Sequence, residues 1–498
     1  MLSSERARSA GVAALGAILL ALAFPRTGIA WVAPLGAAAL FLAWEGASWK
    51  RSFAIGWFAG WIFFTISFWW WTTTIQTVVG SLAYAAVIVA AAIEAFAFGA
   101  AALLGYVART RALPALAPLA TAAAFAIMEW MRSIGPIGVP FAQLGYTQAG
   151  TPLRALAAYI GTNGVTFVLC VVGAYAADAV ARRTWRPFAV AVATIAAATI
   201  VAWGAWPARD VTPPSIPVAA VQGNITQTLK WQPGALQEAI DRYESMTHTA
   251  LARDPKLIVW PETVIAIANG GLNQRPDLLN AFTDLARQGN TTLVAGSLNL
   301  RNDSFYNSLF LFTPQGLTGT YDKRQLVPFA EHFPGQQWLW WLPYIGELNG
   351  HFAEGNGAFV FPTTAGVTIG PLICWESAFA DLAYAEVHSG AQVLVVATDD
   401  AWFGTTSGPY QHAQIAQLRA IEAGEYVVRA AATGISGVIA PDGTWQARAP
   451  LEEQRVVFGM VGKPVGSVFS HIGPTFVWIA MLLAYVFLIF VPGRRRAI

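Results

Sequence analysis

Eight long apolar stretches dominate the amino-acid sequence and limit the ways in which it can fold. Most of them reach the roughly 20 residues that an α-helix needs to cross a bilayer. Only 12% of the 498 residues are charged, whereas an ordinary soluble domain carries about 25% charged residues. We therefore expect a polytopic α-helical membrane protein with about eight spans. The stretches lie at about 9–24, 28–47, 52–75, 78–108, 114–131, 158–181, 187–206 and 474–492.

The first stretch is short and follows Arg6 and Arg8, as the apolar part of a cleaved signal peptide would. No small-residue cleavage site is evident before Pro25, and six more apolar stretches follow before the middle of the chain. The first stretch is therefore interpreted as a retained anchor.

Positive residues between the stretches predict the orientation of the chain. If every stretch spans once, all basic clusters fall on one side of the membrane, which is expected to be the cytoplasm. Both termini then lie inside, and the long segment between the seventh and eighth stretches lies outside. In the inner membrane of a bacterium, the outside is the periplasm. The clusters are Arg6 and Arg8, Lys50 and Arg51, Arg109 and Arg111, Arg182, Arg183 and Arg186, and Arg494 to Arg496.

The composition changes sharply near residue 207, where Trp206-Pro207 ends an apolar stretch and a proline-rich link at 212–217 begins polar sequence. This predicts a transmembrane domain of about seven helices at 1–206 and an extracytoplasmic domain at 207–473. The last helix and a basic cytoplasmic tail follow at 474–498. The net charge of +2 leaves no broad basic surface, so nucleic acid is not an expected partner.

Short apolar runs alternate with helical patterns in the polar domain, which indicates an α/β layered fold. With about 260 residues, the domain is long enough for one large core. Strands are predicted at 218–221, 257–260, 292–295, 309–312, 367–373, 393–397, 427–431 and 456–461. Helices are predicted at 234–252, 276–288 and 408–423.

Two cysteines occur, and they are not expected to pair. Cys170 lies in an apolar stretch and Cys374 in the polar domain. An unpaired thiol outside the cytoplasm is either buried and inert or a nucleophile, and Cys374 by itself leaves both readings open.

Three predicted strand ends carry reactive side chains, and layered α/β domains usually hold their chemistry at such positions. They are 259–262 with Glu262, 321–324 with Lys323, and 372–376 with Cys374. Taken singly, Glu262 also fits a solvated loop carboxylate and Lys323 a surface charge.

Together the three side chains suit acyl transfer. A thiol needs a base to become a thiolate, which Glu262 could provide. Attack on a carbonyl creates an oxyanion, which the Lys323 ammonium could stabilise. The set therefore predicts covalent catalysis through Cys374.

These segments, in this order, resemble the Glu-Lys-Cys triad of the nitrilase superfamily, whose domain is a four-layer αββα sandwich. The covered part is 218–461. The membrane stretches and further segments make the chain similar to the apolipoprotein N-acyltransferase family. Those segments are 221–224 with Trp231, 326–331 and 399–404.

The resemblance implies a role for each matching residue. It makes Glu262 the base, Lys323 the oxyanion stabiliser and Cys374 the nucleophile. It also implies that Glu331 is an accessory carboxylate and that Trp231 and Glu376 lie around the acyl-enzyme. Trp375 stands beside the nucleophile where some relatives carry Tyr. The alternative for Glu331 and Glu376 is that they are only charged residues of a loop or of the surroundings of the site, without a role in the reaction.

The resemblance implies a ping-pong reaction without a cofactor. A phospholipid is the implied acyl donor, and a diacylated apolipoprotein is the acceptor, both held in the bilayer. Two rival functions stay open: a membrane-tethered amidase that passes its acyl group to water, and a transporter or receptor whose outer domain only binds ligand. No metal site is expected, because the histidines show no zinc spacing. They are His248, His332, His351, His388, His412 and His471.

The segment 332–344 is unusually aromatic, with Trp338, Trp340 and Trp341. A buried strand is one reading. Because two prolines and a glycine interrupt the run, and because Trp and Tyr favour the membrane interface, we expect a lid that dips into the outer leaflet beside the site.

Three carboxylates, Glu94, Glu129 and Asp178, fall within or at the ends of apolar stretches, where a charge is costly. None has an evident cationic partner in its own stretch, and the sequence assigns them no role.

Overall fold

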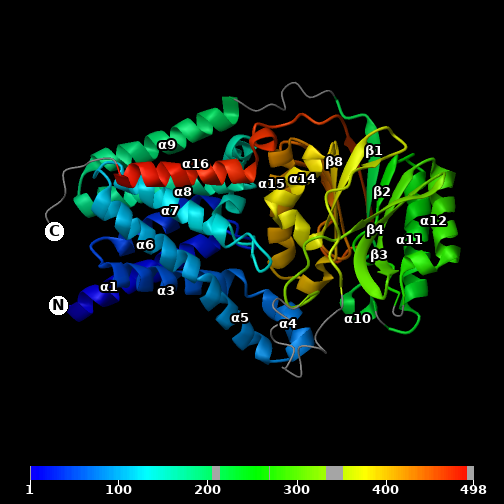
Figure 1. Cartoon of the computed structure of the whole chain (residues 1–498), viewed down its shortest axis with the longest axis horizontal. Coiled ribbons are helices and arrows are strands. Elements are labelled where there is room, and N and C mark those ends of the chain that lie inside the picture. The colour runs from blue at the N-terminus through cyan, green and yellow to red at the C-terminus, as the bar shows by residue number, and fades with distance from the viewer. Residues whose placement is uncertain (1, 205–212, 231, 268–269, 333–351, 491–498) are drawn as a thin grey trace.

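The computed structural model describes residues 2–204, 213–230, 232–267, 270–332 and 352–490 (Figure 1). A bundle of helices forms one part of the molecule, and two β-sheets with further helices form the other. The last helix, α16, returns to the bundle, where it packs against α7 and α8. The bundle helices are α1 (Leu2–Leu22), α2 (Ala33–Trp44), α3 (Trp49–Ser67), α4 (Trp71–Val79), α5 (Leu82–Glu94), α6 (Phe96–Arg111), α7 (Ala117–Met131), α8 (Ala157–Arg182), α9 (Trp185–Gly204) and α16 (Phe469–Phe490).

Four helical segments of the described residues are long and apolar enough to cross a membrane, or five if α3 and α4 count as one bent span. The four segments are Leu82–Arg111, Pro152–Arg182, Trp185–Gly204 and Phe469–Phe490. Shorter apolar helices lie at Ala30–Trp44 and Ala117–Met131. The count of eight spans therefore stays a prediction.

The apolar stretch predicted at 52–75 is divided by a bend of 77° between α3 and α4. The residues after the bend contact the α/β part. The Thr74 hydroxyl donates to the backbone oxygen of Trp402 at 2.8 Å, and the Trp70 ring packs edge-on against Phe403 at 4.6 Å. The second half of this stretch therefore lies against the α/β part.

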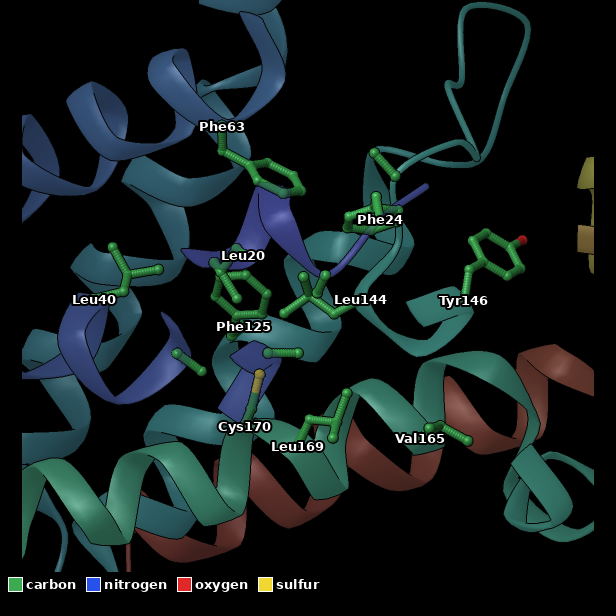
Figure 2. Close-up of a cluster of buried hydrophobic side chains, with 14 of the residues drawn as sticks. Leu20, Phe24, Leu40, Phe63, Phe125, Leu144, Tyr146, Val165, Leu169 and Cys170 are labelled. Carbon is green, nitrogen blue, oxygen red and sulfur yellow. The ribbon is translucent and has the colours of Figure 1, made fainter. Parts of the chain in front are cut away.

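Small residues let the bundle helices approach closely, as is common between helices in lipid. A side chain on Gly16 of α1 would meet the backbone of α2 at Leu40, 2.8 Å away. Figure 2 shows the buried cluster beside this contact, with Leu20, Phe125 and Cys170 among its members. Cys170 is fully buried, and both cysteines are free.

The three carboxylates of the apolar stretches find partners that their own stretches did not reveal. Glu94 pairs with Arg132, which follows α7, at 3.4 Å. Glu129 accepts a backbone N–H at 2.7 Å and a hydroxyl at 2.6 Å. Asp178 pairs with Arg182, one turn further along α8, at 2.5 Å. Partners for Glu94 and Glu129 come from other segments, so only the folded bundle reveals them.

The α/β part contains two six-stranded sheets, with strand orders β12-β1-β2-β3-β4-β5 and β11-β10-β9-β8-β7-β6. The first sheet holds β1 (Ile216–Gln222), β2 (Leu257–Val259), β3 (Thr292–Arg301), β4 (Ser304–Thr313), β5 (Gly316–Asp322) and β12 (Arg455–Val461). The second holds β6 (Phe361–Pro362), β7 (Thr368–Ile373), β8 (Val393–Thr398), β9 (Tyr426–Ala431), β10 (Gly437–Ile439) and β11 (Trp445–Arg448).

The structure confirms all eight strands predicted from the sequence. It also confirms the three predicted helices, which are α11 (Ala235–Leu251), α12 (Pro276–Gly289) and α15 (Gly408–Ala423). The sequence missed β5, β6, β10 and β11 and the helix α14 (Ala380–His388). β5 and β11 are half-exposed strands, so neither forms a continuous apolar run.

Alternate residues of β1 enter different cores, as the period of two in a strand requires. Val218 and Ala220 belong to a buried cluster that also contains side chains of the second sheet. Ala219 and Val221 belong to a cluster shared with α11 and α12. Side chains from the second sheet, α14 and α15 form another cluster. Figure 1 shows α11 and α12 at one side of the strands and α14 and α15 at the other.

A buried carboxylate of α15, Glu422, binds the helical bundle to the α/β part. The backbone of α8 breaks at Gly161, whose φ is +65°, and this leaves the next N–H free. Glu422 of α15 accepts the Thr162 N–H at 2.6 Å and its hydroxyl at 2.7 Å, and it pairs with Arg419 at 2.6 Å. This carboxylate therefore contributes a buried polar link between the two parts.

Replacing this carboxylate should weaken the whole protein. Glu422→Ala leaves the Arg419 guanidinium buried without its ion-pair partner, which costs about 3–5 kcal/mol. We expect a clearly lower thermal unfolding midpoint for the purified, detergent-solubilised chain. Glu238→Ala is the control, because Glu238 pairs with Arg242 at the surface and such pairs contribute at most about 1 kcal/mol. Equal shifts for both variants would contradict a joining role for Glu422.

Candidate active site

The ends of parallel strands bring the predicted residues together. β2 lies parallel to β1 and β3, and β7 lies parallel to β8, so each sheet gathers strand ends at one edge. Glu262 follows β2 and Cys374 follows β7. Lys323 follows β5 and lies beside Asn307, near the start of the antiparallel strand β4. Residues more than a hundred positions apart in the chain therefore lie within one region.

Lys323 lies between two carboxylates. Its Nζ is 3.1 Å from Oε1 of Glu262 and 2.9 Å from Oε1 of Glu331. The side-chain amide of Asn307 donates to the same two oxygens, at 2.7 and 2.9 Å. All of these groups except the partly buried Glu331 are buried. Glu262, Glu331 and Asn307 thus fix the ammonium in place.

The charges of this cluster follow from competing effects on each pKa. Burial alone would lower the pKa of Lys323, but the carboxylates of Glu262 and Glu331 raise it well above its ordinary value. Burial would raise the pKa of Glu262, but Lys323 and Asn307 lower it overall. At neutral pH the ammonium and the Glu262 carboxylate are both ionised.

Cys374 has an unusual backbone and a neutral thiol. Its φ is +50°, in the left-handed region, where a non-glycine residue costs on the order of 1–3 kcal/mol. It begins a short 3-10 helix, η6 (Cys374–Ala378), and is 8% exposed. Burial and the Glu262 carboxylate raise its pKa well above the ordinary value, although Lys323 offsets part of this. The resting thiol therefore keeps its proton.

Glu376 links two segments of the site. Its Oε2 accepts the Ile373 N–H at 2.7 Å and the Tyr321 hydroxyl at 2.9 Å. Its Oε1 accepts the Arg324 N–H at 2.6 Å. Because both oxygens are occupied, Glu376 ties the turn that holds Cys374 to the segment that holds Lys323.

Trp375 faces the helical bundle. Its ring stacks on Phe141, which lies in the connection between α7 and α8, at 5.1 Å and 18°. Phe141 also packs against Trp70 at 5.5 Å. The aromatic residue beside Cys374 is therefore in contact with residues of the bundle. The other predicted aromatic residues, Trp231, Trp338, Trp340 and Trp341, lie outside the described residues.

Several residues of the site were not singled out from the sequence. Asn307 lies inside β4, and no local signal marks it. The Asp399 N–H donates to Oε2 of Glu262 at 2.8 Å, and its carboxylate pairs with Lys230 at 2.5 Å. Asp399 was included from the sequence only as part of the segment 399–404 and was assigned no role of its own. Across the described ranges, no group of three or more His, Cys, Asp or Glu side chains is arranged to hold a metal ion.

Two family descriptions match separate regions of the chain. Carbon-nitrogen hydrolase matches residues 217–462, and the Apolipoprotein N-acyltransferase N-terminal domain matches residues 16–175. An apolipoprotein N-acyltransferase of Geobacter metallireducens is 31% identical over 488 residues, covering 94% of this chain and 92% of that relative. One of Methylococcus capsulatus is 31% identical over 497 residues, covering 98% and 96%. A solved amidase from Nesterenkonia sp. has a TM-score of 0.41 and 17% identity, covering 53% of this chain and 95% of the amidase.

A neutral resting thiol predicts how the rate of Cys374 alkylation depends on pH. Because only the thiolate reacts, the rate at which iodoacetamide alkylates Cys374 should keep rising above the ordinary thiol pKa of about 8.5. Lys323→Met removes a cation that lowers the thiol pKa, so the rise should move to still higher pH. Peptide mass spectrometry measures the rate at Cys374 alone.

Lys256→Met is the matched control, because Lys256 pairs with Asp254 outside the site. It should leave the pH profile unchanged. A plateau near neutral pH in the parent protein would contradict a neutral resting thiol.

Proposed function

The chain belongs to the apolipoprotein N-acyltransferase family, and from this premise we propose that it moves an acyl chain from a phospholipid to apolipoproteins through a thioester on Cys374. The acceptor is the N-terminal amine of diacylglyceryl-cysteine, and this is the last step of lipoprotein maturation. One observation carries the proposal: the Lys323 ammonium is held 3.1 Å from Glu262 beside a buried cysteine with left-handed backbone.

In the first half-reaction, Sγ of Cys374 attacks the carbonyl carbon of a phospholipid ester while its proton moves to the Glu262 carboxylate. The proton moves as the C–S bond forms, because the resting thiol is neutral and Glu262 is ionised. Lys323 donates to the oxyanion of the tetrahedral intermediate. Collapse breaks the C–O bond, and the leaving alkoxide takes the proton from Glu262. The products are a lysophospholipid and the acyl-enzyme.

In the second half-reaction, the neutral α-amine of the lipoprotein cysteine attacks the thioester carbonyl. Glu262 takes a proton from the attacking nitrogen, and Lys323 again donates to the oxyanion. Breaking the C–S bond releases the sulfur, which regains its proton from Glu262. The amide product is an N-acylated lipoprotein, and the enzyme returns to its resting state.

Surrounding groups support these roles. Glu331 accepts from the Lys323 ammonium, and Asn307 anchors the Glu331 carboxylate, so the cation is already in place when charge develops on the carbonyl oxygen. Glu376 fixes the Cys374 turn relative to Lys323. Trp375, Trp231 and the lid tryptophans belong, in this proposal, to the surface that receives lipid chains.

We also infer the four-layer αββα order for the α/β part. The three buried clusters support it, since one is shared by the two sheets, one by the first sheet with α11 and α12, and one by the second sheet with α14 and α15. In this order both sheets are covered on each face.

The proposed topology places the catalytic part at 207–473 in the periplasm. The membrane domain at 1–206 and the last helix with its tail at 474–498 have about eight spans, with both ends in the cytoplasm. The basic clusters support this orientation. Both substrates are amphiphiles, so their chains stay in the outer leaflet while their reactive groups reach the site.

Acylation of Cys374 by phospholipid should depend on all three residues, Cys374, Glu262 and Lys323. Cys374→Ser should form no product, because an alkoxide is far harder to generate than a thiolate. Glu262→Gln should block thioester formation, and Lys323→Ala should slow it by roughly 100- to 1,000-fold. The measurement is mass spectrometry of the Cys374 peptide after incubation with phospholipid, followed by addition of a diacylated lipopeptide.

Transfer and hydrolysis differ in the fate of the acyl group. A thioester that persists in buffer and discharges onto the lipopeptide amine supports the transferase. Rapid loss of the acyl group to water, without N-acylated product, would favour the amidase alternative. Normal acyl-enzyme formation by the Glu262 or Lys323 variant would refute that residue's role.

The topology has its own test. A membrane-impermeant thiol reagent should label Cys374 in intact spheroplasts, because the proposed site faces the periplasm. An epitope added after residue 498 should resist protease supplied from outside and become sensitive when the membrane is opened. Cleavage of that epitope in intact spheroplasts would contradict the eight-span arrangement.

A further inference from the structure

His412 of α15 lies directly behind the backbone of the nucleophile. Its ring Nε2 is 3.1 Å from the backbone oxygen of Cys374 and 2.9 Å from Oγ of Ser377. The Ser377 hydroxyl in turn lies 2.8 Å from the same backbone oxygen. The ring is fully buried. His412 therefore contacts both ends of the short turn in which Cys374 is the first residue.

The other ring nitrogen is anchored by a buried carboxylate. Nδ1 of His412 lies 2.8 Å from Oδ1 of Asp400, and Oδ2 of Asp400 lies 2.7 Å from Arg429. The Thr398 hydroxyl also donates to Asp400, at 2.8 Å. Burial would raise the pKa of Asp400, but Arg429 and His412 lower it to about 2. Asp400 is therefore an ionised and fully hydrogen-bonded support for the ring.

The ring is fixed in its plane as well as at its two nitrogens. Phe141 lies 5.7 Å from the ring at an angle of 48°, and Phe403 lies 6.1 Å away at 68°. Phe403 also packs against Trp70 at the bend between α3 and α4. Rotation of His412 would disturb these aromatic contacts, so the packing opposes it.

The nitrogen atoms of the ring are already engaged, which argues against a role as base for the thiol. Nδ1 faces the ionised Asp400 and so carries a proton. Burial and the Arg429 cation lower the pKa of His412, which favours a neutral ring. Nε2 lies against the Ser377 hydroxyl and the backbone oxygen of Cys374, so it is not a free site for the thiol proton.

The backbone of Cys374 needs such a support. A left-handed φ of +50° in a non-glycine residue persists only where surrounding groups over-determine it. The direction of Sγ depends on this backbone, and a shift of about 1 Å at a reacting atom can cost on the order of 100-fold in rate.

We propose that His412 is a positioning residue, which is held by Asp400 and fixes the turn Cys374–Ala378 so that the thiol faces the acyl donor. His412 takes no part in proton transfer. This inference deepens the proposed function and rests on Cys374 being its nucleophile.

Two substitutions of His412 by an amide residue test the contacts of its two ring nitrogens separately. His412→Gln places a donor and an acceptor where Nε2 lies, and so keeps a contact with the Ser377 and Cys374 turn. His412→Asn places its amide where Nδ1 lies, and so keeps only the contact with Asp400. We expect His412→Asn to slow thioester formation on the order of 100-fold. His412→Gln should recover roughly tenfold of that loss, which is the effect of one hydrogen bond.

Three measurements on the full detergent-solubilised chain test the proposal. The first is the rate of Cys374 thioester formation from phospholipid, and the second is its pH midpoint, which should equal that of the parent in both variants. The third is alkylation of Cys374 by iodoacetamide, which should change by only a few fold, because a small diffusing electrophile tolerates a misdirected thiol. Unfolding midpoints show that both variants are folded.

The outcomes distinguish this inference from the proposed function. Equal loss in the two variants, a shifted pH midpoint, or no loss in either would overturn the positioning role of His412. A parent protein that forms no thioester from phospholipid would count against the proposed function. Thioester formation by the parent protein, together with a slower rate for His412→Asn than for His412→Gln, supports both the proposed function and the positioning role.

Discussion

The buried pair of Lys323 and Glu262 is the interaction on which the site depends. Removing a charge from water is expensive, and it is tolerated only when opposite charges and hydrogen bonds compensate for it. Here one ammonium meets two carboxylates, and Asn307 donates to both of them. This arrangement keeps a full positive charge beside Cys374, where a developing oxyanion would need it. Burial, together with the negative charge of Glu262, raises the pKa of the Cys374 thiol and keeps it neutral at rest.

The two sheets explain how this pair is assembled. Glu262 follows a strand of the first sheet, and Cys374 follows a strand of the second. The contact between Oε2 of Glu262 and the Asp399 N–H, at 2.8 Å, joins the end of β2 to the end of β8. Packing of the sheets on a shared apolar cluster therefore sets the distance between Glu262 and Cys374.

Contacts between the bundle and the α/β part lie close to the same turn. Trp375 and His412 pack against Phe141, and Glu422 of the helix that carries His412 binds the broken end of α8. Buried polar groups with complete partners specify one arrangement strongly, because any other arrangement leaves a charge or a donor unpaired. The helical bundle thus contributes to the shape of the site.

The sequence by itself determined the apolar helices, the eight strands and the segments that hold Glu262, Lys323 and Cys374, because hydrophobic periodicity and local motifs are written in neighbouring residues. Tertiary structure alone decided the bend after Ser67 and the partner of Glu94. It also decided that Asn307, 45 residues from Glu262, bridges two carboxylates. Such partners are chosen by contacts between distant segments, and a buried polar residue in a strand looks the same in the sequence whatever it binds.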